Sequence, residues 1–142
     1  MNYVRLGFWF LTACYWVGMA VLTHLPPRDV PHTPVNDKVQ HFLAYAALAG
    51  FLALTVWVTF PSRPRLIWVV LVIGLAYGFI DEQTQKLVGR SCDLKDWVAD
   101  AFGTMAGVLS VLVLRRFVHL PIPPHRSCQQ AGLIHHPTAA NG

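Results

Sequence analysis

The sequence predicts an all-α fold, a bundle of four transmembrane helices with a polar cluster at the non-cytoplasmic face of the membrane. Hydrophobic residues make up 54% of the chain and charged residues 13%, which is about half the charged share of a soluble domain. Four apolar runs are each about long enough to cross the ~30 Å hydrocarbon core of a bilayer. All seven acidic residues lie in two stretches, 29–37 and 81–100, at the first and third connections between these runs.

The first span is expected from about Leu6 to Leu25, in a run rich in aromatic residues. Arg5 ahead of the run and the small-residue segment Gly18-Met19-Ala20 would also suit a cleavable signal peptide. We interpret the run as an uncleaved anchor, because it is longer and bulkier than the hydrophobic region of a signal peptide. The helix ends at a connection held extended by four prolines, Pro26, Pro27, Pro31 and Pro34.

The second span is expected to begin at Asn36 or Asp37 and to end at Phe60. In the short turn that follows, two prolines break the helix, and Arg63 and Arg65 carry positive charge. Basic residues at a helix end suit the headgroups of anionic lipids.

The third span is expected to start near Leu66 and to continue beyond Ile80 to Leu87 or Val88. Its last two turns then carry acidic residues. Gly89 ends this helix, because glycine readily adopts the left-handed conformation that closes a helix.

The fourth span is expected to follow Asp93 as its N-cap, and Asp96 at the third helical position completes the pattern of a capping box. It ends at about Leu114. Residues 1–120 therefore form one four-helix membrane domain. Residues 121–142 contain Pro, His and Ser without periodicity, and we expect this tail to be disordered.

Four crossings place the first and third connections on the same side of the membrane. Six basic residues lie near span ends on the side of the termini, and five lie on the acid-bearing side. The side of the termini carries no acidic residue, and Arg115-Arg116 directly follows the fourth span. Because basic residues favour the cytoplasmic side, we place both termini in the cytoplasm and the acid-bearing connections outside.

The composition and residue spacing also limit which nucleic-acid, metal and cofactor partners are expected. The net charge of +4 does not indicate a nucleic-acid partner, because the basic residues are scattered around helix ends instead of forming a stripe. The cysteines show no metal spacing and are expected to stay unpaired: Cys14, Cys92 and Cys128. Because no dense ligand motif such as H-E-x-x-H occurs, we expect no metal site and no cofactor. Acids near His41 could still supply ligands for a divalent ion, namely Asp37, Asp81, Glu82, Asp93 and Asp96.

The head of the second span carries the first group of candidate site residues. Asp37, His41 and Tyr45 follow one another at steps of four, with Lys38 beside them, so they lie near one face of a helix. We expect Asp37 to hold the His41 ring and Tyr45 to present its hydroxyl one turn deeper. The alternative is an interfacial histidine that only caps the span.

The end of the third span carries Asp81, Glu82 and Gln85. A charged group inside a span costs about 2.5–3.5 kcal/mol at the centre of the bilayer and less near its edge. We therefore expect these residues to point into the bundle and to meet cations, which Lys38, Lys86, Arg90 and Lys95 could provide. The alternative is a helix that ends at Ile80 and leaves the acids in water.

Arg90 lies in a Gly-Arg-Ser turn before the fourth span. Its guanidinium suits a carboxylate or a phosphate, and the nearby helix start adds free N–H groups. Arg90 either contacts an anionic headgroup or neutralises Glu82, and both interpretations stay open.

The fourth span carries a stripe of Asp96, Asp100, Gly103 and Gly107, at steps of four, three and four. Gly103 and Gly107 are expected to let a neighbouring helix approach closely. Asp100, a turn deeper than Asp96, then faces the interior of the bundle and joins its polar network.

These motifs, in this order, resemble the VanZ-like family of small bacterial membrane proteins. The resemblance covers about residues 37–114. It rests on Asp37-Lys38-x-x-His41-Phe42-x-x-Tyr45, Asp81-Glu82-x-x-Gln85, Gly89-Arg90-x-x-Asp93-x-x-Asp96 and Gly103-x-x-x-Gly107. A similar family pattern often has Asn where this chain has Asp100. The resemblance implies a multi-pass protein of the bacterial cytoplasmic membrane, related to envelope proteins whose founding member is linked to low-level teicoplanin resistance.

Three functions remain open at this stage. In the first, the external site binds, or also modifies, the headgroup of an anionic lipid or a lipid-linked cell-wall precursor. Lys38 and Arg90 would contact the phosphate. The binding residues would be Lys38, Tyr45, Asp81, Gln85, Arg90, Asp93, Asp96 and Asp100.

In the second, the protein is an enzyme on the same class of substrate. His41 would act as general base, held by Asp37, with Glu82 as a second acid or base. No nucleophile is evident, although Ser91 and Cys92 lie close in sequence. In the third, the chain is an accessory subunit of a larger membrane complex, and its polar cluster is an internal network of salt bridges.

Overall fold

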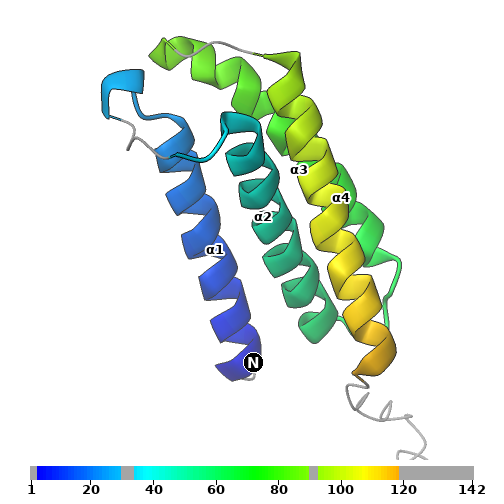
Figure 1. The fold of residues 1–142 in the computed structure, drawn as a ribbon. Helices are drawn as coiled ribbons and strands as arrows, with labels where there is room; N and C mark the ends of the chain where they lie inside the picture. Colours follow the sequence, from blue (N-terminus) through cyan, green and yellow to red (C-terminus); the bar gives the residue numbers. More distant parts are fainter. Residues whose placement is uncertain (1–2, 30–33, 90–92, 119–142) are drawn as a thin grey trace, which may run out of the picture.

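The computed structural model describes residues 3–29, 34–89 and 93–118, and over these residues the protein is helical, with turns between the helices. Its long helices are α1 (Tyr3–Thr23), α2 (Asp37–Thr59), α3 (Leu66–Gln85) and α4 (Leu94–Phe117), with short 3-10 helices η1 (Pro27–Asp29) and η2 (Lys86–Val88). The long helices run side by side as a bundle (Figure 1). Each of the four is long and apolar enough to cross a membrane, which confirms the predicted fold class.

The observed helix bounds agree with the expected spans to within a few residues. The first span was expected over 6–25, and α1 covers Tyr3–Thr23. The second, expected to begin at 36 or 37 and to end at 60, is α2 at Asp37–Thr59. The fourth extends to Phe117 instead of residue 114, because the two arginines that we took as the end of the span continue the helix.

The third helix continues past Ile80, as predicted, and ends at Gln85. The 3-10 helix η2 then leads to Gly89, whose φ of 79° lies in the left-handed region and closes the segment. The acidic residues therefore lie on the last turns of a helix, and the alternative in which the helix ends before them is wrong.

The start of α4 corrects the expected capping box. Asp93 is the N-cap, and its carboxylate accepts a hydrogen bond from the Lys95 N–H at 3.0 Å. The reciprocal bond, from the Asp93 N–H, goes to Glu82 Oε2 at 3.3 Å and not to Asp96. The carboxylate that completes this cap comes from α3, so the start of α4 is tied to the end of α3.

Helix α2 is the centre of the bundle and contacts α1, α3 and α4. It packs tightly against α4 at Gly103 and Gly107, where an added methyl group would collide with the backbone carbonyl oxygens of Phe42 and Ala46. Only glycine permits this approach. The two glycines therefore lie where the sequence placed a close contact between helices.

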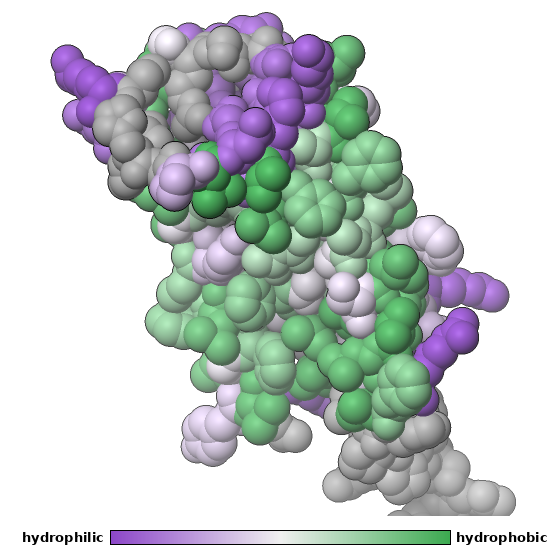
Figure 2. All heavy atoms as spheres, viewed as in Figure 1, coloured by the Kyte–Doolittle hydropathy of each residue, from purple (hydrophilic) through white to green (hydrophobic). Residues whose placement is uncertain are grey.

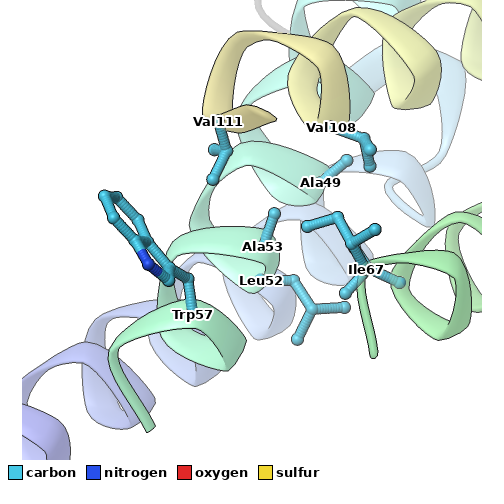
Figure 3. Packing of buried hydrophobic residues seen from close by; sticks show 8 residues of the cluster. Ala49, Leu52, Ala53, Trp57, Ile67, Val108 and Val111 are labelled. Atoms are coloured by element: carbon cyan, nitrogen blue, oxygen red, sulfur yellow. The ribbon is translucent and has the colours of Figure 1, made fainter. Parts of the chain in front are cut away.

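The apolar core lies between α2, α3 and α4, away from the polar end of the bundle. Figure 3 shows side chains of the three helices meeting there: Ala49, Leu52, Ala53, Trp57, Ile67, Val108 and Val111. Other large apolar side chains point outward, and hydrophobic residues cover much of the side of the bundle in Figure 2. In a bilayer these outward side chains would face lipid.

Hydrogen bonds made by polar side chains of α1 join it to α2. The hydroxyls of Thr12 and Thr55 lie 2.7 Å apart and are buried. The Tyr15 hydroxyl donates to the Ala44 carbonyl at 3.0 Å, and the Trp9 ring N–H donates to the Thr59 hydroxyl at 3.2 Å. Hydrogen bonds between membrane helices contribute about 0.6 kcal/mol each on average.

Some predictions concern parts of the chain outside the described residues. These are the position of Arg90 and Cys92 in the third connection, and the disordered tail at 121–142 with Cys128. Cys14, on α1, is free and exposed.

Candidate functional site

The predicted site residues come together at one end of the bundle, where α2 begins, α3 ends and α4 begins. Figure 1 places these three helix ends near one another, opposite the end that holds the N-terminus. Hydrophilic side chains also gather there in Figure 2. His41 of α2, Glu82 of α3 and Asp100 of α4 are the buried centre of this polar cluster, with exposed fractions of 7%, 2% and 1%.

A hydrogen bond between α2 and α4 holds the His41 ring. His41 Nδ1 lies 2.9 Å from Asp100 Oδ1. A carboxylate only accepts hydrogen bonds, so with Asp100 ionised the Nδ1–H group of the ring donates. Asp37, which we expected to hold the ring, is exposed on the first turn of α2, with a carboxylate oxygen within 4.8 Å of a ring nitrogen of His41. Asp100 adds a hydrogen bond to the ring from the facing helix.

Glu82 bridges this pair to the start of α4. Its Oε1 lies 3.8 Å from His41 Nδ1, and its Oε2 accepts the bond from the Asp93 N–H. The predicted juxtaposition of the histidine on α2 and the acids on α3 is therefore present. Two carboxylates from different helices converge on one ring nitrogen.

Asp81 and Gln85 are also buried, as expected, but their partners differ from those we predicted. The Thr23 hydroxyl and the Gln85 amide donate to the Asp81 carboxylate, each at 3.0 Å. His24 Nδ1 lies 3.7 Å from Asp81 Oδ1, and His24 Nε2 lies 2.9 Å from the Thr84 hydroxyl. Gln85 of α3 and Thr23 at the end of α1 thus bond Asp81, with His24 beside them, in place of the expected lysines.

Thr23, His24 and Thr84 are members of this network that sequence reasoning missed. An available signal was the ionisable His24 at the end of an apolar span, where a buried acid of another span needs a partner.

The lysines also pair differently from expectation. Lys38 Nζ lies 2.8 Å from Asp96 Oδ1 and 3.4 Å from Asp93 Oδ2, so it neutralises acids of α4 and not those of α3. Lys86 donates to the Gln83 amide oxygen at 2.9 Å, and Lys95 is exposed. The backbone N–H of Lys95 and the ammonium of Lys38 hold the pKa of Asp93 below its usual range.

Tyr45 lies one turn deeper than His41, as predicted, and is 1% exposed. A methyl group added at Gly78 would lie 3.3 Å from the Tyr45 ring and 3.2 Å from Asp100 Cβ, so a glycine of α3 makes room for both. Its ring centroid is 5.9 Å from that of Tyr77.

Several buried polar atoms of this region make no hydrogen bond to the described residues. They are the hydroxyl oxygens of Tyr45, Tyr77 and Thr104, together with Glu82 Oε1 and Asp100 Oδ2. A buried polar atom without a partner costs about 1–3 kcal/mol. The centre of the cluster thus retains binding capacity for a polar ligand.

Two sets of side chains have potential ligand atoms within 4.8 Å of one another. One set is His41, Glu82 and Asp100, all buried, and the other is Asp37, His41 and Asp96, of which Asp37 is exposed. His41 belongs to both sets.

Comparison with known protein families identifies the chain. Residues 8–115 match the VanZ/LLP1 family. The chain belongs to the VanZ/LLP1 family. The matched segment begins within α1 and takes in the motifs of α2, α3 and α4. Comparisons with curated proteins and with solved structures give no match. Four apolar helices and membership in the VanZ/LLP1 family describe a multi-pass membrane protein.

Proposed function

We propose that the polar cluster binds the headgroup of an anionic lipid or of a lipid-linked cell-wall precursor, at the outer face of the bacterial cytoplasmic membrane. The supporting observation is the convergence of buried ionisable side chains from three apolar helices. Asp100 is six residues into α4, about 9 Å along the axis. Ionisable groups at such depth are costly in a membrane and mark sites of function.

The chemistry of the cluster matches that of a lipid headgroup. Lys38 lies at its rim with 43% of the side chain exposed, and its ammonium suits a phosphate oxygen. The carboxylates of Glu82 and Asp100 suit hydroxyl or amine donors, which glycerol, sugar and amine headgroups carry beside the phosphate. Arg90, expected near the same rim, is the second candidate for contact with the phosphate.

Native mass spectrometry of the full chain, purified in mild detergent, tests this function. We expect an anionic lipid to be retained and Lys38→Ala to weaken its retention at least tenfold. A hydrogen bond to a charged group contributes about 1.5–3 kcal/mol, and each 1.4 kcal/mol is about tenfold in affinity. Lys86→Ala is the matched control, because Lys86 bonds an exposed amide beside it on the chain. Equal retention of anionic and zwitterionic lipids, or by wild type and Lys38→Ala, would exclude the function.

The pairing of His41 with Asp100 favours catalysis on the same lipids as a second candidate. A ring nitrogen held at 2.9 Å by a carboxylate, with Glu82 at 3.8 Å, is an arrangement suited to proton transfer. His41→Asn should then abolish conversion of the lipid and leave its retention intact. A membrane lipid profile that does not change when the protein is deleted would remove this candidate.

A further inference from the structure

We propose that His41, Glu82 and Asp100 form the binding site of one divalent metal ion. The sequence predicted no metal site, because no short ligand motif occurs. These three ligands come from three helices and are 41 and 18 positions apart in the sequence, so no local motif could contain them.

The distances between the ligand atoms suit one ion. Ligands bound at about 2.0–2.2 Å from a metal lie at most about 4.4 Å from one another. His41 Nδ1 is 2.9 Å from Asp100 Oδ1 and 3.8 Å from Glu82 Oε1. The potential ligand atoms of all three residues lie within 4.8 Å of one another, so small side-chain rotations bring them round a single ion. The ion would take the place of the proton that Nδ1 shares with Asp100.

The buried polar atoms supply independent support. Glu82 Oε1 and Asp100 Oδ2 are buried and accept no hydrogen bond from the described residues. The Tyr45 hydroxyl is buried without a partner there as well, and the Tyr45 ring and Asp100 border the same space beside Gly78. A buried carboxylate oxygen that accepts no hydrogen bond is costly in an apolar interior. A cation at the centre would satisfy both free carboxylate oxygens.

The charge balance points to a divalent ion. Among the described residues, Glu82 and Asp100 bring two negative charges to one imidazole, and Lys38 is engaged by Asp96. One imidazole nitrogen with two carboxylates suits first-row ions such as Mn²⁺ or Zn²⁺. Three protein ligands also leave coordination positions open for another group.

The metal also resolves a difficulty of the proposed function, on which this step rests. An anionic phosphate that approaches Glu82 and Asp100 alone would be repelled. A divalent ion between these carboxylates would attract it and could bind a phosphate oxygen in an open position. The metal site would then be the anchor of the headgroup.

Titration of the full chain with Mn²⁺ alone, after treatment with a chelator, tests the site. The electron paramagnetic resonance signal of free Mn²⁺ should decrease by about one ion per chain as the ion binds. Pulsed electron paramagnetic resonance should show coupling of the bound Mn²⁺ to an imidazole nitrogen. Glu82→Gln and Asp100→Asn should each raise the Kd at least tenfold. Asp29→Asn should leave it unchanged, because Asp29 is an exposed acid of the first connection that lies 3.6 Å from Arg28 and is not one of the three ligands.

Absence of saturable Mn²⁺ binding, or binding without nitrogen coupling, would overturn the proposal. Equal affinity of Glu82→Gln and wild type would also overturn it. If the variants lose helical circular dichroism, nitrogen coupling in the wild-type chain decides the question alone. The two proposals fail separately. Mn²⁺ binding without retained lipid would exclude the headgroup function and keep the metal site. Lipid retention without Mn²⁺ binding would exclude the metal site and keep the headgroup function.

Discussion

Adding one methyl group at Gly103 should damage both the helix packing and the polar cluster. In Gly103→Ala the new methyl would meet the Phe42 carbonyl oxygen, which belongs to helix backbone and cannot rotate away. Helices α2 and α4 must therefore separate. Phe42 directly follows His41, and Gly103 is three residues after Asp100. The helices therefore separate next to the hydrogen bond between His41 and Asp100. A shift of about 1 Å would lengthen this 2.9 Å bond beyond the ~3.2 Å limit of a good hydrogen bond.

A matched glycine isolates the packing effect. Alanine in place of glycine favours a helix by about 1 kcal/mol, and overpacking costs about 1–3 kcal/mol. Gly18, in α1, has nothing within 4 Å of an added methyl group. Gly18→Ala therefore includes the gain in helix propensity but not the collision. We expect Gly103→Ala to have a free energy of unfolding about 1–3 kcal/mol below that of Gly18→Ala.

Unfolding by denaturant titration in mixed micelles, followed by circular dichroism, gives both free energies. Nitrogen NMR of the His41 ring reports the bond to Asp100 in the same samples. If the two variants change the free energy of unfolding equally, and the ring signal stays as in wild type, the close approach of α2 and α4 is not what holds the site.

Other predictions follow from single contacts. Thr12→Val removes the buried bond to the Thr55 hydroxyl and should lower the free energy of unfolding by about 0.6–1.7 kcal/mol in the same titration; an unchanged value would show that α1 is held by other contacts. His24→Phe removes the bond to the Thr84 hydroxyl, so hydrogen exchange in the last turn of α1 should become faster, and exchange at the wild-type rate would contradict the docking of α1 on α3. The pKa of Asp93 is lowered in the folded state, so ionised Asp93 adds to the free energy of unfolding. This stabilisation is fully present above the unfolded pKa of about 3.9 and is lost as the pH falls through the folded pKa. In Asp93→Asn the free energy of unfolding should therefore fall less steeply at acid pH than in wild type. An identical pH profile would show that Asp93 does not cause this loss of stability.

Much of the fold follows from local sequence. Apolar runs of sufficient length predict the spans, and prolines, Gly89 and Asp93 mark where helices stop and start, because each acts on the backbone of its immediate neighbours. The glycine spacing on α4 predicts a close helix contact for the same reason. The expectation of no metal site used the same local logic, because it depended on a short ligand motif and not on whether acids of different helices meet around His41.

The partners within the site required the tertiary structure. Steps of four place Asp37 and His41 on one face of a helix, but they do not tell which side chain of another helix faces that histidine. Asp100 holds the ring because Gly103 and Gly107 bring α4 against α2. The same holds for Glu82, which completes the cap of Asp93, and for His24 beside Asp81.

The sequence by itself determined which segments cross the membrane, where their helices end, and that polar residues gather at one end of the bundle, because these properties depend on runs of neighbouring residues. The depth and rotation of each helix relative to the others decided which carboxylate meets His41, and only packing between distant segments sets that geometry.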